Sequence, residues 1–389
     1  MIAPRPRPLA LAGIALSALA FWVALPPIHA RQPWWSVALG VAAAAAGVWA
    51  VSRGARRLGW SAVAAAVIGV GLAILATHAS LTNLEQVVVW SSLLSATLVW
   101  ATPLTYAAIG GLLSERSGVT NIGLEGMMLA GAFFGVLGSD KLGSWELGLL
   151  TAAAGGAGFA LIHAFMSIHL NADQIVTGTA INFLALGATG YLLIVEYGTS
   201  GSPSAVPRVP DVRLGFLGSG FVGNVLGHLN LMIWLSFLLL LAAYLVLFKT
   251  PLGLHIRAVG EYPRAAESAG ISVYATRYGA VVPSGVLAAL GGAYLSIGFL
   301  DSFTENMTQG RGFIALAAVT FGNWRPFGAF AAALLFGGST ALSFRLQQPW
   351  GSVSVLFQAL PYVLTLVAVT GLVARPVPPA ALGRPYAKQ

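Results

Sequence analysis

The chain has 389 residues, of which 57% are hydrophobic and only 8% are charged, against roughly a quarter charged in an ordinary soluble domain. A soluble globular protein is excluded, because so few charged side chains cannot cover a water-exposed surface of this size. The absence of cysteine excludes disulfides, thiolate metal sites, iron–sulfur clusters and thiol redox chemistry. The net charge of +8 comes from Lys and Arg between apolar runs, so it indicates orientation in a membrane rather than nucleic-acid binding.

Apolar stretches follow one another along the whole chain, and most approach the length of about 20 residues that crosses a bilayer as a helix. We therefore predict an all-α, polytopic membrane protein with about ten transmembrane helices and no room for a separate catalytic domain. The first stretch is longer than a signal-peptide core of roughly 7–15 residues, so we expect a retained span. The stretches are 9–25, 35–51, 60–78, 87–113, 124–138, 146–168, 175–195, 231–248, 278–299, 313–344 and 354–373.

One stretch, 313–344, is interrupted by Asn323, Trp324, Arg325 and Pro326. We predict a broken or re-entrant hairpin that returns to the outside, with its irregular backbone facing a cavity, since such backbone is tolerated only where protein or water satisfies it. Two short helices packed without a functional role are the alternative.

The distribution of Lys and Arg predicts that both termini are cytoplasmic. Cytoplasmic segments of membrane proteins carry an excess of these residues. With the N-terminus inside, 13 of the 20 positive residues are cytoplasmic, and they are Arg5, Arg7, Arg53, Arg56, Arg57, Arg116, Lys249, Arg257, Arg264, Arg277, Arg375, Arg384 and Lys388.

Few polar side chains occur inside the predicted spans, and each is a functional candidate because burying it in lipid is costly. Asn121 and Glu125 begin one span; we expect Asn121 to cap that helix and Glu125 to lie at an interface or a cavity. Span 175–195 places four small or polar residues on one face, namely Gly178, Asn182, Ala185 and Thr189, which suits either a solute pathway or a helix contact. Asn323 and Trp324 complete the predicted pathway residues; aromatic Trp324, Phe183 and Tyr191 either stack on a solute or face lipid and neighbouring helices.

Several kinds of chemistry have no support in this chain. No Gly-Lys-Ser/Thr sequence is present, so a nucleotide-binding P-loop is missing, and the six histidines lack the spacing of metal ligands. We expect no ATPase or other enzymatic activity, no cofactor and no metal. Gly198-Thr199-Ser200-Gly201 has the form found in rhomboid proteases, but its only later histidines, His228 and His255, lie in predicted loops, and we reject the protease.

The longest predicted cytoplasmic segment, residues 250–277, contains a short helix. Pro263 is placed as a first helical residue and Gly270 as a terminator, which predicts two turns carrying Arg264 and Glu267. So short a helix is unstable alone in water and must pack on the bundle or on a partner. A membrane protein without a motor but with such a helix has what coupling to a separate ATPase requires.

Three blocks resemble the permease subunits of bacterial ABC importers for nucleosides and simple sugars, within the branched-chain amino acid/ribose-type permease family. The blocks are Ser114–Phe133, Gly260–Ile271 and Gly310–Pro326, and the similarity covers roughly residues 85–373. The family's coupling loop has the pattern Glu-Ala-Ala, three residues, Gly, and later Ile-x-Leu-Pro. Ala265, Ala266, Gly270 and Pro283 match it, whereas Arg264 replaces the acid.

The resemblance implies an ATPase subunit inside, a second permease subunit (a paralogue or the same chain), and a solute-binding lipoprotein outside, in the bacterial cytoplasmic membrane. Glu261, Arg264, Ala265, Ala266, Glu267 and Gly270 are then the residues that couple ATPase closure to the spans. The predicted organisation is extra transmembrane segments in 1–80, a permease core in 81–375 and a cytoplasmic tail in 376–389. Two alternatives stay open: an ion-coupled secondary transporter of a small polar solute, and a noncatalytic scaffold protein.

Overall fold

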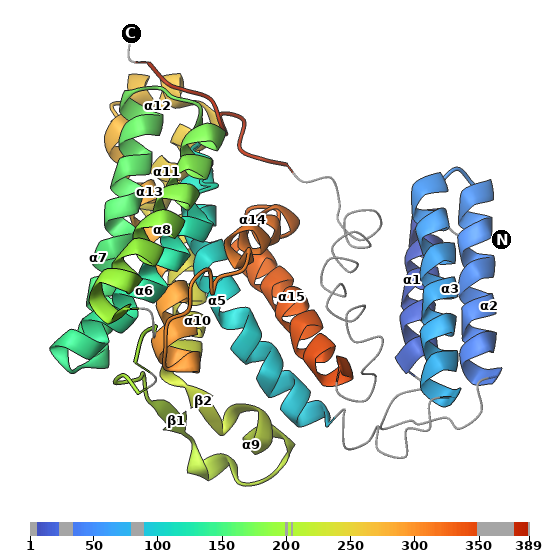
Figure 1. The fold of residues 1–389 in the computed structure, drawn as a ribbon. Helices are drawn as coiled ribbons and strands as arrows, with labels where there is room; N and C mark the ends of the chain where they lie inside the picture. The colour runs from blue at the N-terminus through green and yellow to red at the C-terminus, as the bar shows by residue number, and fades with distance from the viewer. Residues whose placement is uncertain are drawn as a thin grey trace. The chain divides into compact units, whose positions relative to one another are not determined.

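The computed structural model describes residues 6–22, 34–78, 89–198, 201–203, 205–347 and 377–387, and most of them are helical (Figure 1). The predicted span 354–373 and Ser200 lie outside these residues. The long helices are α1 (Pro6–Trp22), α2 (Trp34–Ser52), α3 (Arg56–His78), α5 (Trp90–Arg116), α6 (Leu124–Leu142), α7 (Trp145–Ala164), α8 (Gln174–Tyr197), α10 (Leu231–Lys249), α13 (Val273–Ala293) and α15 (Pro326–Gln347). The shorter ones are α9 (Phe221–Leu226), α11 (Pro251–Glu261), α12 (Pro263–Ser268) and α14 (Arg311–Phe321).

Seven of these helices are long and apolar enough to cross a membrane, counted over the described residues only: α2, α5, α7, α8, α10, α13 and α15. Phe165–His169 and Tyr294–Leu300 continue α7 and α13 as π-helical segments. In the described part, the one β-sheet is a short antiparallel pair, β1 (Asp211–Arg213) with β2 (His228–Asn230). The prediction of an all-α polytopic membrane protein is confirmed.

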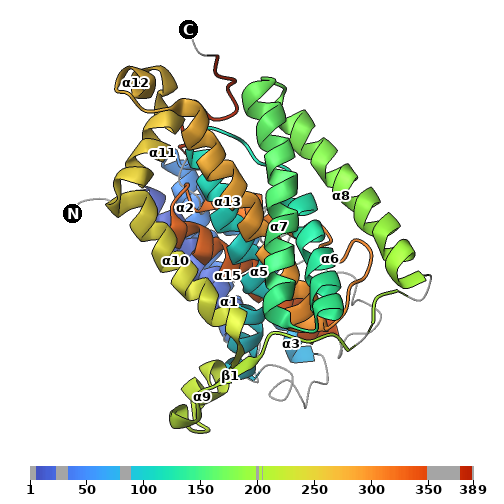
Figure 2. The same ribbon diagram turned by 90° about the vertical axis from the view of Figure 1, so that its left-hand side faces the viewer.

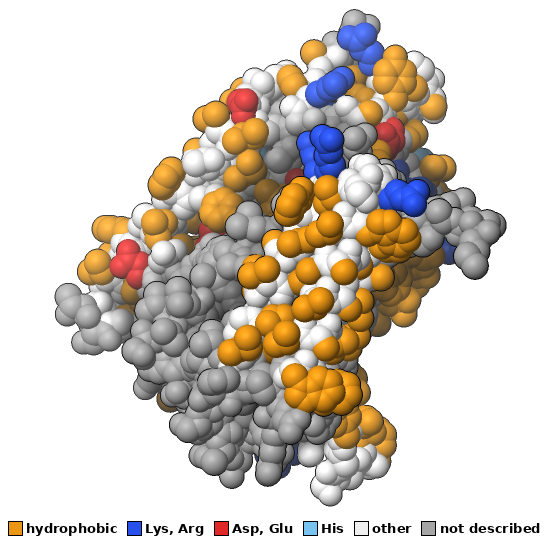
Figure 3. Space-filling view, turned by 90° about the vertical axis from the view of Figure 1, so that its right-hand side faces the viewer, with side chains coloured by type: hydrophobic (Ala, Val, Ile, Leu, Met, Phe, Trp, Pro, Cys, Tyr) orange, Lys and Arg blue, Asp and Glu red, His pale blue; other side chains and the backbone are white. Residues whose placement is uncertain are grey.

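The chain divides into two compact units, Met1–Ala96 with Gly338–Arg375, and Thr97–Gly337 with Pro376–Gln389. In the first unit α1, α2 and α3 pack on one another. Their contacts use small residues, because a Cβ on Gly47 would lie 2.7 Å from the Gly59 carbonyl oxygen. Figure 3 shows mainly apolar side chains on the described helices.

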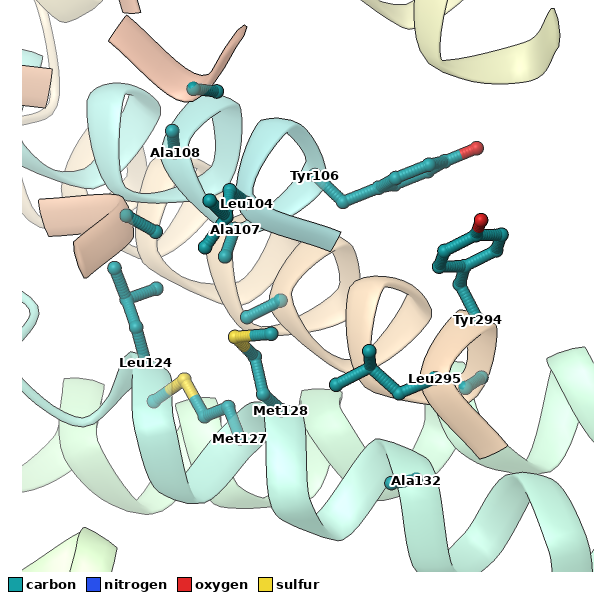
Figure 4. Close-up of a cluster of buried hydrophobic side chains, with 14 of the residues drawn as sticks. Leu104, Tyr106, Ala107, Ala108, Leu124, Met127, Met128, Ala132, Tyr294 and Leu295 are labelled. Atoms are coloured by element: carbon teal, nitrogen blue, oxygen red, sulfur yellow. The ribbon is translucent and has the colours of Figure 1, made fainter. Parts of the chain in front are cut away.

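The second unit is built around α6, α7 and α13. A Cβ on Gly131 of α6 would lie only 2.1 Å from the carbonyl oxygen of Ala289 on α13, so glycine is required where the two backbones meet. Close approach through small residues provides the contact area that helices in lipid need, since no hydrophobic force draws them together there. Figure 4 shows Met128 of α6 pointing towards Leu104 of α5, with Met127 beside Leu124, within one buried apolar cluster.

The second unit has two distinct ends (Figures 1 and 2). One carries α11 and α12 and is called the α12 end below; the other carries β1, β2 and α9 and is called the hairpin end. The predicted helix after Pro263 is confirmed as α12, and Gly270 follows it with a φ of 82°. The preceding residues were expected as a loop, yet they form α11, since Thr250 caps the helix and Pro251 begins it.

The stretch 313–344 is interrupted where the sequence predicted, but its second helix, α15, is long enough to cross a membrane, and the return of this segment to the outside stays a prediction. α14 ends at Phe321 and α15 begins at Pro326. Between them Asn323 and Trp324 adopt left-handed φ values of 51° and 52°. Such values are uncommon away from glycine, so surrounding contacts must hold this turn in place.

Candidate functional site

The loop between α5 and α6 runs back into the bundle rather than staying at its end. The Asn121 side-chain amide donates a hydrogen bond to the Ser284 hydroxyl at 2.9 Å. Ser284 lies eleven residues into α13, which is about 16 Å along the helix at roughly 1.5 Å per residue. α6 therefore begins well inside the bundle. We call the group of residues around its start, which includes Asn121 and Glu125, the mid-depth site.

Glu125 occupies the centre of this mid-depth site and is only 8% exposed. Its carboxylate accepts three hydrogen bonds, from the Thr308 hydroxyl at 2.5 Å, the Gly310 amide at 2.8 Å and the Gly312 amide at 2.6 Å. Gly310 and Gly312 stand at the start of α14, where the unpaired amides and the helix dipole favour a negative charge. The expectation that Glu125 lies at an interface or a cavity is wrong, because these donors compensate its burial.

Asn121 does not cap α6 as expected. The N-cap position is Gly123, and it makes no side-chain hydrogen bond. Asn121 is fully buried, and its amide also contacts the Met127 sulfur at 3.5 Å, while its side-chain oxygen has no partner among the described atoms. Its side chain thus ties the inward-running loop to α13.

Asn182 of α8 binds the start of α6 through two hydrogen bonds, whereas Asn121 binds this region to α13. The Asn182 side-chain oxygen accepts from the Gly126 amide at 2.8 Å, and its side-chain nitrogen donates to the Ile122 carbonyl at 3.0 Å. Gly178 and Ala185 of the same face also approach this segment. Of the two alternatives for this face, the structure shows the helix contact. Phe183 and Tyr191, 71% and 68% exposed, lie on the outer face of α8.

Three polar residues of this region were missed from the sequence. The Gln174 side-chain oxygen accepts from the Thr120 amide at 2.7 Å, and a His163 ring nitrogen lies 3.1 Å from the Thr120 carbonyl oxygen. Ser284 is the third. His163 and Ser284 are isolated polar residues in apolar runs, and Gln174 follows a polar turn. Nothing in these segments indicates that the partner is a distant loop.

Trp324 and Asn323 anchor the turn between α14 and α15 to other segments of the second unit. The Trp324 indole donates to the Glu115 carboxylate at 2.5 Å, and the Arg116 guanidinium donates twice to the Trp324 carbonyl, at 2.8 and 2.7 Å. The Asn323 side-chain oxygen accepts from the Val377 amide at 2.9 Å. Trp324 is 4% exposed, so its side chain is buried in protein contacts, and a cavity beside the backbone of this break stays a prediction.

The predicted coupling residues lie together at the α12 end. Arg264 and Ala265 of α12 are exposed, whereas Ala266 packs into a small buried cluster with Val259, Val273 and Tyr386. Glu261 ends α11, and Glu267 lies on the last turn of α12. Among the described residues, no group of three or more His, Cys, Asp or Glu side chains is placed to hold a metal ion. The geometry thus provides an exposed helix, α12, that a partner can contact, and two helices that begin inside the bundle, α6 and α14.

Comparisons with known proteins agree with this architecture. The family described as the permease component of the branched-chain amino acid transport system matches residues 93–369. The guanosine ABC transporter permease protein of Bacillus subtilis is 43% identical over 328 residues, covering 78% of this chain and 99% of that protein. The nucleoside ABC transporter permease protein of Lactococcus lactis is 36% identical over 307 residues, covering 75% and 95%.

A putative glucose ABC transporter permease protein of Haloferax volcanii is 36% identical over 262 residues, covering 66% of this chain and 78% of that protein. No solved structure matches the chain. The matched region includes the mid-depth site, α12 and the α14–α15 turn, all of them described above from the geometry alone. The chain therefore belongs to the permease family of the branched-chain amino acid type of transport system.

Proposed function

We propose that this chain is the membrane-spanning permease subunit of an ATP-binding cassette importer that moves a nucleoside across the bacterial cytoplasmic membrane. The main support for this proposal is the family membership of the chain, together with its 43% identity to a guanosine permease over nearly all of that protein. The sugar-permease relative keeps a simple sugar as the second solute class. The chain has no P-loop of its own, so ATP hydrolysis belongs to a separate subunit and the chain is not an enzyme.

The α12 end faces the cytoplasm in this proposal. Lys and Arg are enriched on the cytoplasmic side of membrane proteins. The two described ends of the second unit differ in the same sense, with seven such residues at one end and three at the other, while Arg311 lies between them at the start of α14. At the α12 end these residues are Arg116, Lys249, Arg257, Arg264, Arg277, Arg325 and Arg384, and at the hairpin end they are Lys141, Arg208 and Arg213. The C-terminal residues 377–387, which lie at this end, are then cytoplasmic, and the distribution of Lys and Arg in the sequence supports a cytoplasmic N-terminus as well.

The partners follow from this orientation. The ATPase subunit docks at the α12 end, a second permease subunit completes the pathway, and a solute-binding lipoprotein meets the outer face. The hairpin end carries β1, β2 and α9 beyond the spans and is the element in reach of that lipoprotein. We infer alternating access, with closure of the ATPases transmitted through residues 261–270.

Asn121, Glu125, Asn182, Asn323 and Trp324 serve the translocation pathway by shaping it. Each is hydrogen-bonded to another segment of the second unit. They hold α6 and α14 as helices that begin at mid-depth, and interrupted helices of this kind surround the central site of many transporters. Because the Glu125 carboxylate is already compensated, the pathway suits a polar, uncharged solute better than an ion.

The test is uptake by the assembled complex. The chain is purified with its ATPase and second permease, reconstituted in liposomes with the binding lipoprotein, and supplied with radiolabelled guanosine or glucose. We expect guanosine uptake that requires internal ATP and that stops when the ATPase carries a substitution of its catalytic glutamate. Uptake by this chain alone, driven by a proton or sodium gradient, would instead support the ion-coupled transporter.

A further inference from the structure

The C-terminal residues 377–387, called the strap below, lie across the α12 end of the second unit (Figures 1 and 2). The Ala381 amide donates to the Gly260 carbonyl at 2.9 Å, and the Gly383 amide donates to the Gly118 carbonyl at 3.1 Å. The strap is thus hydrogen-bonded through its backbone to the end of α11 and to the loop that follows α5.

Tyr386 anchors the far end of the strap and is only 6% exposed. Its hydroxyl donates to the Glu267 carboxylate, and its ring lies against the Arg277 guanidinium, 5.9 Å from the ring centre. Burial, reinforced by the hydrogen bond to Glu267, raises the pKa of Tyr386 to about 12. The hydroxyl is therefore a stable donor at neutral pH.

Both acidic residues of the predicted coupling segment face the strap. Glu267 accepts from Tyr386, and Glu261 accepts from the Ala380 amide at 3.2 Å. A helix of six residues cannot maintain itself in water, so α12 depends on such contacts for its position. The strap supplies them from a segment more than 110 residues away in the chain, as the sequence separation of 119 shows for both bonds.

The exposed surface that results combines residues of α12 and of the strap. Arg264 of α12 is exposed, and its charge acts on Tyr386. Arg384 of the strap is also exposed, while its backbone carbonyl accepts from Arg277 at 3.3 Å. Glu267 is half-buried against the strap, whereas Glu261 is exposed, so this surface offers a partner two guanidinium groups beside one exposed carboxylate.

Building on the proposed function, we propose that the ATPase docks on a composite surface made of α12 and the C-terminal strap, with Arg264 and Arg384 facing acidic groups of the ATPase. Glu261, Glu267 and Tyr386 are positioning residues, which hold the strap against α12 and do not themselves contact the ATPase. The strap is therefore part of the interface and not a free tail.

The first experiment uses labelling, because the native chain contains no cysteine. Arg384→Cys is reacted with a water-soluble maleimide in membrane vesicles that hold the complete complex, and in vesicles that hold the permeases alone. We expect bound ATPase to slow labelling of Arg384→Cys at least fivefold and to leave Arg213→Cys, an exposed control at the hairpin end, unchanged. Equal labelling of Arg384→Cys with and without the ATPase overturns the proposal.

The second experiment measures ATPase affinity in the complex for Arg384→Glu, Tyr386→Phe and a chain that ends at Pro376. A charge reversal at an interface rim weakens binding by roughly five- to tenfold, and we expect this for Arg384→Glu with its thermal unfolding unchanged. Tyr386→Phe is expected to lower affinity, whereas Tyr191→Phe on the outer face of α8 is the matched control. Parental affinity in both Arg384→Glu and the shortened chain would overturn the proposal.

The two proposals fail in different ways. If the parental complex shows no ATP-driven uptake, the proposed function is wrong. If the parental complex transports and binds its ATPase, but the strap variants do so equally well, then only the composite docking surface is wrong.

Discussion

Replacement of Glu125 tests whether this carboxylate caps α14 or lines the pathway. Glu125→Ala removes the acceptor of three hydrogen bonds and leaves the Thr308 hydroxyl and the Gly310 and Gly312 amides without it, in a site where Glu125 is 8% exposed. A buried donor left without a partner costs about 1–3 kcal/mol, and loss of a charge at a helix N-terminus costs up to about 2 kcal/mol. Allowing for partial relaxation, we expect about 3–6 kcal/mol of lost stability.

The matched variants sharpen this expectation. Glu125→Gln keeps one oxygen acceptor but loses the charge and one acceptor position, so we expect about 1–3 kcal/mol. Glu305→Gln is the control, because Glu305 is exposed and lies in the loop that carries Thr308 and Gly310. Such surface substitutions change the free energy of unfolding by no more than about 0.5 kcal/mol. Unfolding is followed by tryptophan fluorescence in detergent with increasing denaturant.

The result separates the two roles of Glu125. A capping role predicts that stability falls in the order Glu305→Gln, Glu125→Gln, Glu125→Ala, and that transport falls with it. A pathway role predicts a Glu125→Gln protein of parental stability with reduced uptake. Parental stability of Glu125→Ala would refute the reasoning from the three hydrogen bonds.

Three further predictions follow from the second unit. Gly131→Leu is expected to prevent recovery of folded protein, because α6 and α13 meet at that position; Gly158→Leu, with nothing within 4 Å of its Cβ position, keeps the parental yield in size-exclusion chromatography. Trp324→Phe leaves the buried carboxylate of Glu115 without its indole donor and is expected to cost about 1–3 kcal/mol in denaturant unfolding. Folding raises the pKa of Tyr386 to about 12. The stability that the neutral hydroxyl contributes is therefore complete below the ordinary pKa near 10 and is lost as the pH rises from 10 through 12. Limited proteolysis between pH 7 and pH 12 should cleave the strap only above about pH 10.

Local sequence patterns were sufficient to predict the long helices that the structure describes and the short helix. Apolar length gave the long helices, and Pro263 with Gly270 gave the bounds of α12, because helix termini are marked by neighbouring residues. The interruption at Asn323 to Pro326 was visible for the same reason. These features are encoded within a few residues of where they appear.

The contacts that build the site are not encoded locally. Glu125 accepts a hydrogen bond from Gly310, which is 185 residues further along the chain. The residues next to Glu125 in the sequence therefore showed that burying its charge is costly, but not which distant donors offset that cost. The inward course of the loop before α6 depends in the same way on Ser284 and Asn182. Residues 377–387 were predicted only as part of a cytoplasmic tail, although they are bonded to several distant segments.

A continuous set of polar contacts leads from the α12 end to the mid-depth site. Glu267 of α12 holds the strap, the strap holds Asn323 of the α14–α15 turn, and the start of α14 holds Glu125. Hydrogen bonds are strengthened in surroundings of low dielectric constant, so segments joined in this way tend to move together. A chain of contacts becomes a coupling route only when both ends bias the same two-state element, and α14 is the element in contact with both. These polar contacts join the interrupted helices α6 and α14 to the exposed helix α12.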